Sequence, residues 1–131
     1  MKYTITVRGT EIEVDELEFG VHKGSPEGNV DLYIRVADNE EDIYTGEAKK
    51  TLWTEWLDAC LEDKQNPGER IRKVEAKVFG GESDSTPFRT LVIEHGFLAD
   101  FDEHSQGIDY GYTALIRRAP RKKGEISVKA G

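Results

Sequence analysis

The sequence predicts a mainly β protein, a small antiparallel β-barrel with one α-helix at about residues 47–64. Apolar and polar residues alternate in many short segments, which is the period of half-buried strands. Glycine and proline clusters separate these segments at intervals of roughly 8–12 residues, as in small barrels and sandwiches. The apolar period becomes helical in one segment only, whereas a doubly wound parallel sheet needs a helix after each strand.

Length, composition and charge narrow the class of protein further. The chain of 131 residues is 37% hydrophobic and 34% charged, so we expect one domain, 1–131, that folds without a metal or disulfide. One cysteine, no charged-then-apolar leader and no apolar run of about 20 residues predict a soluble protein made in a reducing compartment, with no membrane contact. A formal charge of −8 argues against a general nucleic-acid binder.

The first 40 residues predict three strands. Residues 3–8 alternate and precede a turn at Gly9-Thr10, and the acidic run 12–19 shifts its apolar phase near Asp15, which predicts a bulge or bend. We expect these two runs to pair as a hairpin with an acidic, solvated face. A glycine- and proline-rich loop at 22–29 leads to a third strand over 32–36.

Apolar residues in the helical segment recur at steps of three and four, and Pro67 prevents the helix from continuing. Two tryptophans at helical spacing favour a core role over a partner anchor. Cys60 shares this apolar stripe, so we expect a small buried hydrophobe rather than a reactive thiolate. The stripe consists of Leu52, Trp53, Trp56, Leu57, Cys60 and Leu61.

The second half predicts five more strands, over 71–79, 91–94, 97–101, 108–116 and 125–128, with a glycine- and serine-rich loop at 80–87. The helix is expected to close one open end or edge of the barrel. The predicted core comprises Ile5, Val7, Leu32, Ile34, Trp56, Leu57, Cys60, Val74, Val78, Ile93, Phe97, Tyr112 and Ile116.

The sequence contains no recognisable set of catalytic residues. Neither common phosphate-binding glycine loop is present, and the serines lie in loops without nucleophile-elbow glycines. The carboxylates and imidazole of residues 100–104 have the donor types of a divalent-cation site, but an exposed polar loop explains them without further assumptions. We therefore predict a protein that is not an enzyme and has no cofactor, catalytic residue or metal site.

Charges of opposite sign are segregated along the chain. An acidic segment lies near the N-terminus and a basic block follows residue 116, which favours head-to-tail association between copies, although the basic block would also suit a phosphate. The candidate assembly contacts are Arg117, Arg118, Arg121, Lys122, Glu11, Glu13, Glu16 and Glu18.

The order of elements over about residues 45–128 resembles the haemolysin-coregulated (Hcp) tube proteins of type VI secretion and the tail-tube proteins of contractile phages. The segments that carry the resemblance are 52–60, 71–79, 87–93, 97–101 and 110–117.

This resemblance implies a structural subunit. Six copies would form a ring through their sheet edges, and rings would stack into a hollow tube. The implied partners are further copies of the chain and the sheath, baseplate or spike proteins, with DNA or an effector protein as cargo. The implied location is the cytoplasm during assembly and afterwards a virion tail or an extracellular particle.

Two other readings stay open. A tube initiator, terminator or spike adaptor with the same barrel would show the same pattern. A small barrel that binds a peptide or small ligand, through Trp53 or through the loops that contain Ser25 and Ser83, is the alternative from another class.

Overall fold

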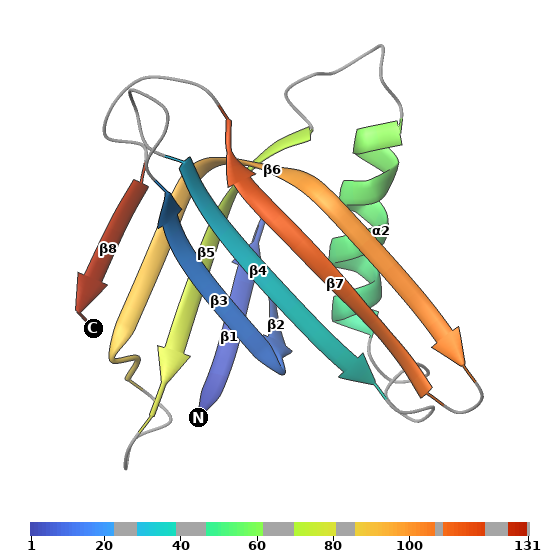
Figure 1. The fold of residues 1–131 in the computed structure, drawn as a ribbon, viewed down its shortest axis with the longest axis horizontal. Coiled ribbons are helices and arrows are strands. Elements are labelled where there is room, and N and C mark those ends of the chain that lie inside the picture. The colour runs from blue at the N-terminus through green and yellow to red at the C-terminus, as the bar shows by residue number, and fades with distance from the viewer. Residues whose placement is uncertain are drawn as a thin grey trace.

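The computed structural model describes residues 1–22, 29–38, 47–61, 70–80, 86–106, 109–119 and 126–130. Over these ranges the chain forms eight strands and one helix, which confirms the predicted mainly β fold with a single helix (Figure 1). The elements are β1 (Lys2–Val7), β2 (Thr10–Val14), β3 (Glu16–His22), β4 (Asn29–Asp38), α2 (Glu47–Leu61), β5 (Ile71–Phe79), β6 (Arg89–Gln106), β7 (Asp109–Arg118) and β8 (Ile126–Ala130).

The strands form one antiparallel sheet in the order β2-β1-β5-β6-β7-β4-β3, and β8 pairs with β6 outside this path. The sheet curls, so that β3, β4 and β7 lie nearer the viewer than β1 and β2 in Figure 1. The first part of β6 lies between β5 and β8, and the second part continues along β7.

The predicted term barrel applies only loosely to the described residues, because their sheet is open. Its two ends, β2 and β3, are consecutive in sequence and are joined at Asp15. From this corner β2 runs along β1 and β3 runs along β4, and no ladder joins β2 to β3 in the described part of the chain. The covalent link brings the two ends of the sheet together, but hydrogen bonds do not close it.

The hairpin between β1 and β2 was predicted correctly, but its turn lies one residue earlier than expected. Val7 pairs with Thr10, and the two residues between them have positive φ, 51° at Arg8 and 78° at Gly9. Two central residues with positive φ match the twist of the flanking strands. Glycine adopts this conformation without strain, whereas positive φ is unfavourable for the Arg8 backbone.

Two strand predictions need correction. The run 12–19 is two strands rather than one bent strand, because β3 pairs with β4 and only β2 completes the hairpin with β1. The predicted strands 91–94 and 97–101 belong to the single 18-residue strand β6. Gly96 lies at their junction, where a Cβ would meet the Arg72 carbonyl oxygen at 3.2 Å, so glycine permits the close approach of β5.

Most of the predicted core is confirmed, since nine of its members are buried: Ile5, Val7, Leu32, Ile34, Trp56, Val74, Ile93, Tyr112 and Ile116. The other four, Leu57, Cys60, Val78 and Phe97, are half-buried. Leu61 was placed on the apolar stripe of the helix but is 80% exposed. It follows Trp56 by five positions, which rotates it by about 140° around the helix, away from the sheet.

Candidate assembly surface

The aromatic residues of α2 belong to the interior and not to a binding surface. Trp53 is 4% exposed and Trp56 is fully buried, and their rings stack with centroids 6.2 Å apart. The Trp53 indole N–H donates to the Tyr112 hydroxyl at 2.7 Å, and the Trp56 indole N–H donates to the Arg70 carbonyl at 3.1 Å. Both indoles are therefore satisfied within the chain, which removes Trp53 as an anchor for a ligand.

Two residues around this cluster depart from the sequence analysis. Arg72, which was not singled out, is 5% exposed, with its guanidinium 5.9 Å from the centroid of the Trp56 ring and 3.4 Å from the Glu55 carbonyl oxygen, to which it donates. Cys60 is half-buried rather than buried. Desolvation raises the pKa of the Cys60 thiol, and the positive charges of Arg72 and Arg70 oppose this rise. A raised pKa favours the neutral thiol, and the chemical inertness of Cys60 stays a prediction.

The polar loop expected after Phe101 is strand, because β6 continues to Gln106 along β7. Alternation along this strand sends Phe101 inward, where its ring lies 5.5 Å from that of Trp53, and leaves Asp100 and Asp102 exposed on the other face. Within the ranges that the structure describes, no three His, Cys, Asp or Glu side chains gather in a way that could hold a metal ion.

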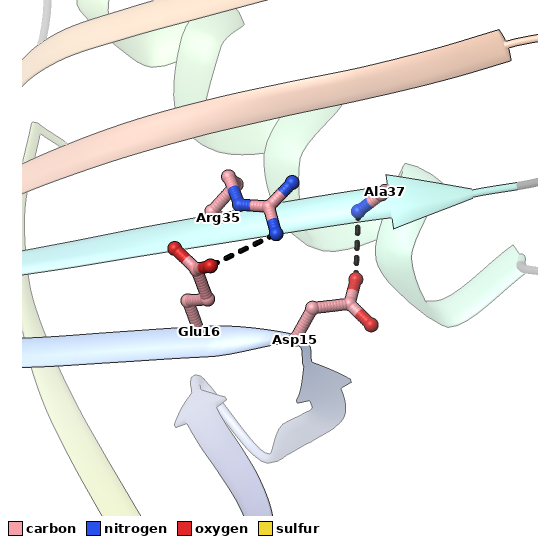
Figure 2. Close-up of polar contacts among 4 residues, drawn as sticks. All are labelled: Asp15, Glu16, Arg35 and Ala37. Atoms are coloured by element: carbon pink, nitrogen blue, oxygen red, sulfur yellow. Dashed lines mark hydrogen bonds and ion pairs between the residues drawn. The ribbon is translucent and has the colours of Figure 1, made fainter.

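The corner between β2 and β3 is held by hydrogen bonds to a distant strand. The backbone N–H of Asp15 donates to the Arg35 carbonyl at 3.0 Å, and the Asp15 carboxylate accepts the Ala37 N–H at 2.7 Å (Figure 2). Both partners lie on β4. Asp15 therefore sets the position at which β3 begins to pair with β4.

The residue after this corner forms an exposed ion pair. Glu16 lies directly opposite Arg35 in the β3–β4 ladder, and the guanidinium donates to its carboxylate at 2.9 Å (Figure 2). This hydrogen bond lowers the pKa of Glu16 and raises that of Arg35. Because both side chains are solvated, the pair adds little to the stability of the fold.

The structure brings part of the predicted basic block onto the same surface as part of the acidic segment. Arg117 on β7 donates to the Asp31 carboxylate on β4 at 2.7 Å, and β4 also pairs with β3. Arg118 is half-buried at the end of β7, and Arg121 and Lys122 lie outside the described residues. Glu11 and Glu13 are exposed on β2, whereas Glu16 and Glu18 are exposed on β3.

Four strands build one continuous outward surface, because residues paired across antiparallel strands share a face. One cross-strand row is Glu18, Tyr33, Leu115 and Asp100, and the adjacent row is Glu16, Arg35, Thr113 and Asp102. We call the outward side of β3, β4, β7 and the second half of β6 the acidic face. Its charged members in these rows, with the neighbouring Asp31–Arg117 pair, are Glu16, Glu18, Asp31, Asp100, Asp102, Arg35 and Arg117.

Sequence analysis identified Glu16 and Glu18 on this face but not Asp31, Asp100 or Asp102. Asp31 lies on β4, whereas Asp100 and Asp102 lie on β6 in the 100–104 segment, which the sequence analysis considered only for metal binding. Alternation does predict that they point outward. It does not predict that β3, β4, β7 and β6 are neighbours, so no sequence signal marks them as one set.

No protein-family model and no curated protein sequence matches the chain. Solved structures do match. Hcp1 from Flavobacterium johnsoniae superposes over 100% of this chain and 97% of its own, with a TM-score of 0.55 at 13% identity. A chain of the extended sheath–tube complex of PVC, an extracellular contractile injection system, also matches. The match covers 98% of this chain and 88% of that chain, with a TM-score of 0.59 at 6% identity.

A third match is the tube-terminating cap of the anti-feeding prophage, over 98% of this chain and 88% of its own, with a TM-score of 0.55 at 6% identity. At such low identities the likeness concerns the fold, and it extends over almost the whole chain. The chain therefore has the Hcp-like fold of tube proteins from secretion and contractile injection systems.

Proposed function

We propose that this chain is a structural, non-enzymatic subunit that assembles into rings, of six copies, which stack into a hollow tube. The observation that carries the proposal is the likeness to Hcp1 and to an injection-system tube over 98–100% of the chain. A matching fold admits many functions, so the argument also needs a feature of this molecule that suits self-assembly.

That feature is the open sheet. Within the described residues β2, β3 and β8 each pair with one strand only, so each leaves one edge of backbone donors and acceptors without a strand partner. Such edges promote aggregation unless they are covered or used. Ring closure between copies would pair them, which supports assembly through sheet edges.

We further propose charged contacts between copies. Of the predicted contact residues, Glu11 and Glu13 lie on β2, Glu16 and Glu18 on β3, and Arg117 and Arg118 on β7. Glu16 and Arg117 form ion pairs within the chain. We propose the loops at 22–29 and 80–87 as further contacts between copies; they lie largely outside the described residues.

The proposed surroundings follow from the same comparison. The PVC match is a complex of sheath and tube, which supports a sheath protein as partner. A baseplate or spike protein is a further proposed partner. DNA or an effector protein would be cargo. We propose assembly in the cytoplasm and later residence in a virion tail or extracellular particle, the last as for the extracellular injection-system structure that this chain resembles. Among the described residues, no helix has the length and apolarity to span a bilayer.

Light scattering and negative-stain microscopy test the proposal. At a protein concentration of about 100 µM, low salt and neutral pH, we expect rings or stacks that partly dissociate at about 1 M salt, where the screening length falls to about 3 Å. Stacks of unlimited length indicate a tube subunit, and single rings that do not stack indicate a cap or terminator. A monomer with no rings overturns the proposal in favour of a monomeric peptide- or ligand-binding module.

A further inference from the structure

We propose that the acidic face of one copy docks on a cationic, partly apolar end of the next copy. We call this second surface the cationic end and define it as Lys2, Arg89 and Lys129 around Phe88. This inference rests on the proposed self-assembly and identifies the two surfaces that meet.

The cationic end lies where four strands begin or end. β1 begins, β5 ends, β6 begins and β8 ends at the same end of the molecule (Figure 1). Lys2 lies opposite Phe79, and Arg89 lies opposite both Val78 on β5 and Ala130 on β8. Lys129 lies opposite Thr90, the residue after Arg89. Lys2 and Lys129 therefore share one face of the sheet and Arg89 lies on the other, so the three cations meet only around the strand ends, although they are as far as 127 positions apart in sequence.

The cationic end has an apolar centre. Phe88 is 46% exposed, and its ring and the Met1 methyl group both lie beside Gly80, 3.3 Å and 3.5 Å from the position that a Cβ would occupy there. The Lys2 ammonium lies 5.5 Å from the ring centroid of Phe79 on the neighbouring strand. An exposed aromatic residue among cations is a typical centre for a protein contact.

Among the residues that the structure describes, these cations outnumber the carboxylates that could pair with them. Glu75 pairs with Lys77 at 3.5 Å, and Glu94 pairs with Lys73 at 4.0 Å. The described part of the chain offers Lys2, Arg89 and Lys129 no carboxylate partner. A second copy that covers these strand ends would therefore meet positive charges from both faces of the sheet that no described carboxylate compensates.

The acidic face has the complementary surplus. Arg35 and Arg117 pair with Glu16 and Asp31, and among the described residues Glu18, Asp100 and Asp102 have no cationic partner. Glu18 and Asp100 flank the half-buried side chains of Tyr33 and Leu115 in one cross-strand row. This face therefore also has an apolar centre between charges, with the opposite sign to the cationic end.

The charges specify the direction of association. Two acidic faces repel each other, and so do two cationic ends, so the attractive contact is head to tail. Such a contact uses two different surfaces, and repeating it gives a closed ring or a continuing stack. The occupant of the cationic end is accordingly a second copy of this chain.

A charge-swap experiment tests the inference. The acidic-face variant is Glu18→Lys with Asp100→Lys, and the end variant is Arg89→Glu with Lys129→Glu. All four side chains are exposed, so we expect both variants to fold, which circular dichroism and thermal melting check. A matched control, Glu55→Lys with Asp58→Lys, makes the same charge change on exposed positions of α2.

We expect each variant alone to self-associate at least about tenfold more weakly than the wild type, measured by sedimentation velocity. Mixing the two variants in equal amounts makes both kinds of contact attractive again, so assembly should return while the control assembles normally. If the wild type does not assemble, the proposed function fails. If the wild type assembles and the variants assemble equally well, or their mixture does not recover, the inference about the surfaces fails.

One more variant separates this inference from a contact through the basic block. Arg117 lies on the acidic face, so Arg117→Glu makes that face more negative and should leave head-to-tail assembly intact or strengthen it. If Arg117 instead binds the acidic segment of a neighbouring copy, the same variant weakens assembly. Weakening by Arg117→Glu without weakening by the end variant overturns the proposal.

Discussion

The aromatic interior beside α2 and the acidic face lie on opposite sides of the same strands. On the inner side of β7, Tyr112 accepts a buried hydrogen bond from Trp53 and lies edge-on to its ring. On the outer side of the same strand, Arg117 forms an ion pair with Asp31 in which both side chains contact solvent. The two contacts have the same donor–acceptor distance, 2.7 Å, but their loss is expected to change the stability of the fold by different amounts.

The difference is one of solvation. An inner contact that is lost leaves a cavity or an unpaired polar group away from water, which costs stability. An outer ion pair that is lost is replaced by water, and most such pairs contribute about 0–1 kcal/mol. We therefore expect stability and the proposed assembly to be separable: inner substitutions should lower the free energy of unfolding, and outer substitutions should change association between copies.

The largest effect is expected for Trp56→Ala. The side chain is fully buried, stacks on Trp53 and lies under the Arg72 guanidinium, so its removal leaves a large cavity and should lower the free energy of unfolding by about 3–5 kcal/mol. Urea denaturation measures this loss. Thr54→Ala, an exposed change on the same helix, is the control, and a loss for Trp56→Ala no larger than the loss for Thr54→Ala would contradict the placement of α2.

A smaller loss is expected for Tyr112→Phe, which keeps the ring but removes the acceptor of the Trp53 N–H. The buried indole N–H is then unpaired, at a cost of about 1–3 kcal/mol in the free energy of unfolding. Tyr33→Phe removes a hydroxyl from the outward face and should cost much less. Equal losses for the two variants would remove the contrast between the inner and outer sides.

Asp15→Ala tests the corner, which belongs to neither side. It removes the carboxylate that accepts the Ala37 N–H, and the loss should be about 1–2 kcal/mol in the free energy of unfolding. Asp15→Asn keeps an oxygen acceptor and should retain part of this stability. Glu13→Ala on the exposed side of β2 is the control, and an Asp15→Ala variant as stable as this control would show that the Asp15 carboxylate does not hold the corner.

The smallest effect is expected at Glu16, where the hydrogen bond from Arg35 lowers the pKa. A carboxyl group with a lower pKa in the folded state stabilises the protein above its unfolded pKa of about 4.3, and the contribution disappears as the pH falls through the folded value. Glu16→Gln should therefore lower the melting temperature slightly at about pH 7 and not at about pH 2, where Glu16 of the wild type is protonated.

Glu18→Gln is the matched control for this small effect, because no described residue forms an ion pair with Glu18. It should change the melting temperature less than Glu16→Gln does at neutral pH. A difference between wild type and Glu16→Gln that is the same at both pH values would show that the ion pair with Arg35 is not its cause.

The acidic face shows which surface residues the sequence alone can and cannot group together. Glu16 and Glu18 stand out because they lie in one acidic run, and alternation along β6 is consistent with Asp100 pointing outward. The grouping of Glu18 with Asp100 depends on two intervening strands, β4 and β7, that are distant in sequence. The cationic end was missed for the same reason, since Lys2, Arg89 and Lys129 are isolated charges in three separate strands.

By itself the sequence determined the local elements of this protein: strands of period two, the helix from residue 47, and nine of the buried core residues, including Trp56 and Ile93. These follow from which side of a short segment is apolar, and that property is local. Only the tertiary structure decided that the sheet stays open at Asp15, that β6 is one long strand, and which charges share a surface. Those features depend on which strands become neighbours, and strand pairing is set by packing across the whole chain.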